Sequence, residues 1–144
     1  MTLNNLVIVV PCYNEQDNIE QLIHDYTDIV NKTGALLLLI DDGSKDGTVK
    51  KIESLKHLCN IELVKKNNSG HGATIRFGYD YAIKHGYEYI FQIDSDNQID
   101  SNIFWQLYDK RLNYDFILGR RVTREDGFFR LLTTSSFINF LDVC

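Results

Sequence analysis

Asp94 and Asp96 lie two positions apart in the stretch "FQIDSDNQID", residues 91–100, directly after an apolar run, and Gln98 follows at the same spacing. In an extended segment every second side chain points to the same face, so two carboxylates and an amide oxygen would converge. Carboxylates this close repel each other unless a cation neutralises them. Oxygen ligands of this type are preferred by Mg²⁺ and Mn²⁺. We therefore predict a divalent metal site formed by Asp94, Asp96 and Gln98.

Two other interpretations of this stretch have to be weighed. The pattern D-x-D-x-[DN] also begins a calcium-binding EF-hand loop, but the sixth position is Ile99 instead of glycine and the twelfth is Trp105 instead of glutamate. The calcium loop is therefore excluded. A solvated turn, in which Ser101 caps the following helix, stays open as the alternative to a metal site.

Three further polar motifs follow apolar runs: "PCYNE" at 11–15, "DDGSKDGT" at 41–48 and "NNSGHGAT" at 67–74. The second motif is either a β-turn with a helix cap or a place where Asp42 meets a nucleobase or ribose. The third is either a simple turn or a glycine-rich loop that brings backbone N–H groups to a phosphate. We expect His71, within that third motif, to be exposed rather than catalytic.

Alternating strands and helices must position these motifs. Apolar runs predict strands at 6–10, 35–40, 61–64, 87–93 and 115–119. Helical spacing predicts a helix capped by Asn14, a second over 46–58, a third ending near 84 and a fourth around 103–108. This order, with strands that are apolar on both faces, indicates one α/β domain over 1–144 with a mostly parallel sheet. In such sheets ligands bind at the carboxyl ends of the strands, where the polar motifs lie.

Composition excludes several classes of protein. The net charge of -5 argues against a nucleic-acid-binding protein, which usually has a basic balance. The three cysteines form no CxxC pair, so we expect reduced thiols in the cytoplasm rather than a disulfide framework or structural zinc. The N-terminus lacks the basic and apolar regions of a signal peptide. No stretch reaches the roughly 18 apolar residues of a membrane span.

The motifs "VVPCYNE", "DDGSKDGT", "NNSGHGA", "DSDNQ" and "GRR" occur together and in this order. The ordered set resembles the nucleotide-sugar-binding half of a family 2 glycosyltransferase, from Val7 to about Asn139. Within that family the pattern is most similar to the polyprenyl-phosphate type, which transfers mannose or glucose to dolichyl or polyprenyl phosphate. The resemblance implies a GT-A fold, a Rossmann-like α/β sandwich, and inverting transfer of a hexose from a UDP- or GDP-sugar.

The resemblance also implies roles for individual residues. The residues expected to bind the nucleotide-sugar are Pro11, Tyr13, Glu15, Ile40, Asp42, Asp94, Ser95, Asp96 and Arg121. Tyr13 would stack on the base, and Asp42 would accept hydrogen bonds from base or ribose. Asp94 and Asp96 would be the DxD carboxylates that bind Mg²⁺ or Mn²⁺, with Gln98 beside them. Asp96, Arg121 and Arg130 would be the catalytic residues.

The acceptor implied by the resemblance is a lipid phosphate, which is already anionic and needs arginine rather than a general base. We then expect a peripheral or anchored association with the inner face of the membrane, and a role in cell-envelope biogenesis. Two alternatives remain: transfer to a saccharide hydroxyl in polysaccharide synthesis, which needs a general base, and a nucleotide-binding domain without catalysis. The apolar stretch 128–143 ends at Cys144 without a stop signal, and we expect a chain truncated at its C-terminus.

Overall fold

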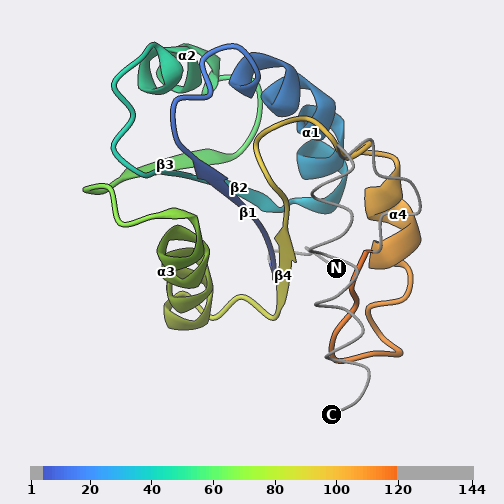
Figure 1. Ribbon diagram of the computed structural model, residues 1–144. Helices are drawn as coiled ribbons and strands as arrows, with labels where there is room; N and C mark the ends of the chain where they lie inside the picture. Colours follow the sequence, from blue (N-terminus) through green and yellow to red (C-terminus); the bar gives the residue numbers. More distant parts are fainter. Residues whose placement is uncertain (1–4, 120–144) are drawn as a thin grey trace, which may run out of the picture.

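A four-stranded parallel sheet forms the centre of the molecule (Figure 1). The computed structural model describes residues 5–119. Its strand order is β3-β2-β1-β4, and each of the three pairings is parallel. The elements in chain order are β1 (Leu6–Cys12), α1 (Ile19–Thr33), β2 (Leu36–Asp41), α2 (Thr48–Leu55), β3 (Ile61–Lys65), α3 (His71–Lys84), β4 (Tyr89–Gln92) and α4 (Ile103–Tyr108).

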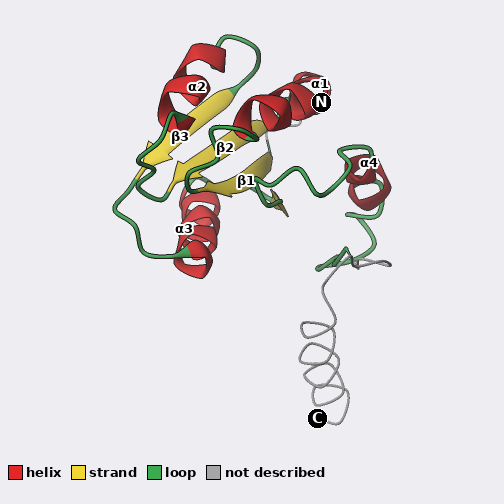
Figure 2. Ribbon diagram, turned by 45° about the horizontal axis from the view of Figure 1, so that its top comes forward, coloured by secondary structure: helices red, strands yellow, loops and turns green. Residues whose placement is uncertain are grey.

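Helices cover both faces of the sheet, as the strands that are apolar on both faces require. Figure 2 shows α1 and α2 on one face and α3 on the other. Ile8 and Leu37 face the larger part of the core, which α1, α2 and α4 complete. Val9 and Ile40 point the opposite way, into the layer beneath α3. The prediction of an α/β domain with a mostly parallel sheet is thus confirmed for the described residues.

The helix α3 lies unusually close to the sheet at one glycine. A Cβ atom at Gly78 would collide with Cγ1 of Val9 and would stand 2.9 Å from Cδ1 of Ile40. Both contacted side chains are completely buried in the two central strands. Only a residue without a side chain allows this approach, so Gly78 fixes the distance between α3 and the sheet.

An aromatic cluster fastens α4 beside the edge strand. Phe104 is fully buried, and its ring packs edge-on against Phe91 of β4 with 5.0 Å between centroids. The rings of Trp105 and Tyr108 lie 5.0 and 5.1 Å from the same ring. This packing fixes the segment between β4 and α4, which carries the acidic motif.

The structure corrects several predicted boundaries. The first helix begins at Ile19 rather than after Asn14, because Asn14 does not cap it: its Oδ1 accepts from the backbone N–H of Lys45, and its φ is left-handed at 55°. The predicted strand at 115–119 is not formed. Phe116 and Leu118 are 79% and 78% exposed there, so the apolar pattern of this segment is not buried against a neighbouring strand.

The other elements agree with the sequence to within a few residues. α2 covers 48–55 instead of 46–58, and β4 covers 89–92 instead of 87–93. β1 runs through Pro11 to Cys12 and is two residues longer than predicted. Among residues 5–119, no helix is long and apolar enough to cross a membrane.

Candidate nucleotide-sugar site

The loops that follow β1, β2, β3 and β4 meet at one edge of the sheet, because parallel strands present their carboxyl ends together. A cavity of about 340 Å³ opens at this edge. Residues from all four connections line it: Pro11, Cys12, Tyr13, Glu15, Asp42, Asn68, Gly70, His71, Thr74 and Ser95.

Reciprocal hydrogen bonds join the loop after β1 to the loop after β2. The backbone N–H of Asn14 donates to Oγ of Ser44 at 2.9 Å, and the backbone N–H of Lys45 donates back to Oδ1 of Asn14 at 2.9 Å. The left-handed backbone of Asn14 permits this exchange, and asparagine tolerates that conformation better than most residues. These bonds place the half-exposed ring of Tyr13 at the cavity rim.

A second pair of contacts joins the same loops one step further along. The backbone N–H of Glu15 donates to Oγ1 of Thr48 at 2.8 Å, and that of Gln16 donates to Oδ2 of Asp46 at 3.2 Å. Burial opposes ionisation of Asp46, but hydrogen bonds from Thr48 and from the Gln16 amide prevail and lower the pKa of its carboxyl. Because Glu15 lines the cavity, these bonds also set the position of a cavity carboxylate.

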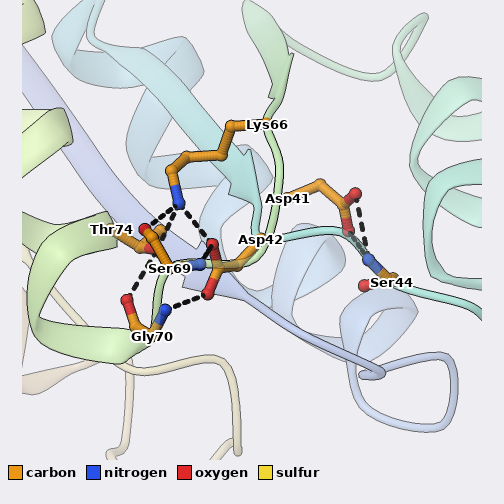
Figure 3. Close-up of polar contacts among 7 residues, drawn as sticks. All are labelled: Asp41, Asp42, Ser44, Lys66, Ser69, Gly70 and Thr74. Atoms are coloured by element: carbon orange, nitrogen blue, oxygen red, sulfur yellow. Dashed lines mark hydrogen bonds and ion pairs between the residues drawn. The ribbon is translucent and has the colours of Figure 1, made fainter.

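Asp42 anchors the glycine-rich loop to the end of β2 (Figure 3). Its Oδ1 accepts from Nζ of Lys66 and from the backbone N–H of Ser69 at 2.9 Å, and its Oδ2 accepts from the backbone N–H of Gly70 at 2.9 Å. Lys66 also donates to Oγ of Ser69 at 2.5 Å and to Oγ1 of Thr74 at 3.2 Å. The loop is therefore held in place before any ligand binds.

The electrostatics of this anchor favour an ionised Asp42. Burial alone would raise the pKa of the carboxyl, but the hydrogen bonds from Lys66, Ser69 and Gly70 outweigh it, and the pKa lies below its ordinary value. Gly70 has φ of 91° and ψ of 161°, a region open essentially to glycine alone. The glycine is thus required for its N–H to reach Asp42 and for α3 to begin at the next residue.

The thiol in the cavity is chemically quiet. Burial, together with the nearby charges of Glu15 and Asp41, raises the pKa of Cys12 above its usual range. The side chain is 1% exposed. A protonated, buried thiol is a poor nucleophile, so Cys12 acts as part of the wall.

The acidic motif forms a turn rather than an extended segment. β4 ends at Gln92, residues 95–96 lie in a turn, and Asn97 has a left-handed φ of 55°. The prediction that alternation alone aims Asp94, Asp96 and Gln98 at one face is therefore wrong. The prediction fails because the turn interrupts the alternation of side chains. Asn97 holds this turn against the start of α1 by donating from Nδ2 to the Asn18 carbonyl at 2.8 Å.

Asp94 contacts a residue of the cavity, whereas Asp96 makes only the local bond that is usual for an aspartate in a turn. Asp94 lies 3.4 Å from Nε2 of His71, a cavity residue, and its Oδ1 accepts from Nε2 of Gln92 at 3.1 Å. Asp96 is partly exposed and accepts the backbone N–H of Gln98 at 3.2 Å. Both carboxylates keep free oxygen lone pairs, and although neither lines the cavity, Ser95 between them does.

These two carboxylates suit a divalent cation that arrives with a diphosphate. Within residues 5–119, no group of three or more His, Cys, Asp or Glu side chains is placed to hold a metal by itself. Mg²⁺ characteristically takes one or two carboxylates and completes its shell with phosphate oxygens and water. The donor set fits that mode of binding and does not fit a metal cage made only of protein ligands.

The structure gathers part of the predicted site and leaves part aside. Pro11, Tyr13, Glu15, Asp42 and Ser95 line one cavity. The side chain of Ile40 is instead fully buried beneath α3, and Gln98 is exposed outside the cavity lining. Arg121 and Arg130 lie outside the described residues.

Sequence reasoning missed several residues of the glycine-rich loop as members of the site. Asn68 and Thr74 line the cavity, and Lys66, which does not line it, binds the cavity residue Asp42. His71 is exposed, as expected, but it also lines the cavity. The glycines between β3 and α3 are the sequence feature that could have assigned these residues to the site, because such loops bring the backbone close to a ligand.

A family model and several known proteins match this chain in sequence. The family model described as "Glycosyl transferase family 2" matches residues 7–141. An uncharacterised glycosyltransferase, YkoT of Bacillus subtilis, is 29% identical over 160 residues and aligns with 95% of this chain. An undecaprenyl-phosphate 4-deoxy-4-formamido-L-arabinose transferase of Proteus mirabilis is 27% identical over 143 residues, also with 95% of this chain aligned. The chain spans 44% and 43% of the length of these two relatives.

Solved structures share the fold. Staphylococcus aureus TarS, residues 1–349, in complex with UDP-GlcNAc superposes with a TM-score of 0.62 at 22% identity, covering 83% of this chain and 37% of that one. Glucosyl-3-phosphoglycerate synthase from Mycobacterium tuberculosis in complex with UDP gives a TM-score of 0.59 at 22% identity, covering 81% and 46%. The predicted GT-A α/β fold is confirmed by these likenesses.

Proposed function

Because this chain belongs to glycosyl transferase family 2, we propose that it moves a hexose from a UDP- or GDP-sugar to a polyprenyl-phosphate-type lipid, with inversion. The observation that carries the proposal is a cavity lined from the connections that follow all four strands. The similar proteins named for undecaprenyl phosphate and solved with UDP or UDP-GlcNAc support the acceptor and donor classes. The reaction would take place at the cytoplasmic face of the membrane.

In this proposal the cavity residues bind and orient the donor. The ring of Tyr13 stands half-exposed at the rim, where it can stack on a nucleobase. Asp42 accepts a hydrogen bond from the base, while Pro11, Glu15 and Ser95 shape the walls. Since the loops are already fixed by internal hydrogen bonds, little conformational freedom is lost when the nucleotide binds.

The leaving diphosphate lies, in this proposal, between the glycine-rich loop and the acidic motif. Asp94 and Asp96 would hold Mg²⁺ or Mn²⁺, which supplies Lewis-acid stabilisation of the charge that develops on the diphosphate. Arg121 and Arg130 would bind the acceptor phosphate in the bidentate manner that guanidinium groups favour. A phosphate acceptor is already anionic, and no general base is then required of this chain.

Sugar transfer by the full chain tests this function. Labelled UDP- and GDP-hexoses are offered with Mn²⁺ and either undecaprenyl phosphate or an oligosaccharide, and we expect label only in the lipid. Asp96→Asn should reduce turnover about a hundredfold, because charge stabilisation in the transition state is lost. Asp109→Asn, at an exposed position just after α4, is the matched control and should leave turnover unchanged.

The result separates the competing functions. Transfer only to the oligosaccharide would overturn the lipid acceptor and support the saccharide alternative. Binding of a nucleotide-sugar without transfer to any acceptor would support a nucleotide-binding domain without catalysis. Full turnover in Asp96→Asn would remove the metal role assigned to the acidic motif.

A further inference from the structure

The carboxylate of Asp42 has fewer free acceptor positions than its place in the cavity wall suggests. An ionised carboxylate offers about four lone-pair positions, two on each oxygen. Lys66 and the Ser69 N–H occupy both positions on Oδ1, and the Gly70 N–H occupies one on Oδ2 (Figure 3). One acceptor position on Oδ2 therefore remains for a ligand.

Thr74 does not use this last position. Its hydroxyl has a single proton, which it donates to the carbonyl oxygen of Gly70 at 2.9 Å. Thr74 Oγ1 in turn accepts from Lys66 at 3.2 Å. Its only proton is thus used by Gly70, no bond from Thr74 to Asp42 has hydrogen-bond geometry, and one position on Oδ2 remains.

The ammonium group of Lys66 is also fully used. Its three N–H donors go to Asp42, to Oγ of Ser69 and to Oγ1 of Thr74. The side chain is only 18% exposed, and that of Asp42 is 5% exposed. Neither partner can turn away from the other without leaving a buried charge unpaired, which is costly. Lys66 therefore occupies its side of the carboxylate in this structure.

Nucleobases differ in what they require of such a group. The Watson–Crick edge of guanine presents two adjacent N–H donors, which a carboxylate with two free oxygens binds side by side. Uracil presents one N–H between two carbonyl oxygens, and cytosine presents an unprotonated ring nitrogen at the same place. A single free acceptor satisfies the one N–H of uracil and leaves one of the two guanine donors unpaired.

We propose that Lys66 is a specificity-determining residue, which restricts Asp42 to one free acceptor and so selects uridine over guanosine nucleotides. The inference rests on the proposed function, because it assumes that the cavity binds the donor nucleotide. It goes beyond that function by naming the base and by giving a role to a lysine that does not line the cavity. Lys66 acts through Asp42 and touches no part of the donor.

Nucleotide binding by the full chain tests the inference without relying on catalysis. Isothermal titration calorimetry with UDP, GDP and CDP, each with Mn²⁺, should show UDP binding about tenfold more tightly than GDP, because one buried donor of guanine stays unpaired. Lys66→Met frees a position on Oδ1 and should remove most of this preference. Lys66→Arg keeps a cation on Oδ1 and should retain the preference for UDP. Lys65→Met is the control, since Lys65 is the exposed neighbouring residue at the end of β3.

If circular dichroism shows that Lys66→Met does not fold, a second variant tests the free acceptor position on Oδ2 of Asp42. In Asp42→Asn the amide oxygen must face the cation of Lys66, so the amide nitrogen takes the position of Oδ2 and the bond from the Gly70 N–H is lost. A donor then replaces the free acceptor, so the preference for UDP over GDP should be lost. Unchanged order of affinities in Asp42→Asn would overturn the inference.

The outcomes keep the inference apart from the proposed function. Equal affinity for UDP and GDP in the unaltered chain overturns the role of Lys66 while a nucleotide-binding site remains. An unchanged preference for UDP over GDP in folded Lys66→Met also overturns the role of Lys66. Absence of binding by any nucleoside diphosphate with Mn²⁺ removes the proposed function itself, and the inference with it.

Discussion

Substitution of Gly78 by alanine tests whether the close approach of α3 to the sheet is built into this fold. A methyl group at this position has no free space, since it would meet Val9 and Ile40 in the two central strands. Both side chains are β-branched and fully buried, so neither can turn aside cheaply. We expect α3 to be pushed outward and the protein to be destabilised.

Two opposing terms set the size of the effect. Alanine in a helix interior is favoured over glycine by about 1 kcal/mol. Overpacking a dense core costs about 1–3 kcal/mol, and two buried contacts place Gly78→Ala near the upper end of that range. The net loss of unfolding free energy is then about 2 kcal/mol, which corresponds to a decrease in Tm of roughly 6 °C for a chain of this size.

Gly72 provides the matched control on the same helix. A Cβ atom there meets nothing within 4 Å, and its φ is not positive. Gly72→Ala should therefore gain a few tenths of a kcal/mol or stay neutral. Thermal and urea unfolding, followed by circular dichroism, measure both variants. Equal Tm values for Gly78→Ala and Gly72→Ala would falsify the packing argument, because helix propensity acts on both and the collision on one.

Three further predictions concern the core, the loops and the response to pH. Phe104→Ala should lower the unfolding free energy by about 3–5 kcal/mol, measured by urea unfolding, because it removes the central ring of the α4 cluster. Asn14→Ala should lower it by about 1–2 kcal/mol and Asn14→Asp by less, because alanine loses the bond from Lys45 and is strained at positive φ; equal losses would refute this. The lowered pKa values of Asp42 and Asp46 mean that their stabilisation is complete above the ordinary aspartate pKa and is lost as pH falls through their folded values. Acid unfolding of Asp42→Asn should therefore depend less on pH below about 4.

The order of strands and helices was predictable because the strands are continuous apolar runs. "LVIVV" and "ALLLLI" are buried on both faces, and such segments have few alternatives to a central strand. The helix α1 was recognisable from its apolar spacing, but its start was placed too early. Asn14 was interpreted as a helix cap, whereas its side chain accepts from a loop that lies 31 residues away in sequence. Short-range patterns contain no information about such a partner.

The sequence predicted where the candidate site lies in the fold, but not how its side chains are arranged. The polar motifs do meet at the carboxyl ends of the strands, as parallel topology requires. A turn here was expected only as the alternative to a metal site, with Ser101 as the cap of the next helix. The structure has the turn but no side-chain cap on α4, and the bond from Asn97 to Asn18 was not predicted because only the folded chain brings these residues together. The bond between Lys66 and Asp42 was not predicted either, since a lysine at a strand end normally reaches solvent.

The reciprocal bonds between the loops after β1 and β2 have a consequence for protein engineering. Asn14 and Gln16 contact residues 44–47, and each loop donates backbone N–H groups to side chains of the other. Neither loop is a separable module. Replacing either loop by that of another protein would require both segments to be exchanged together, because a single transplanted loop leaves unmatched backbone donors on its neighbour.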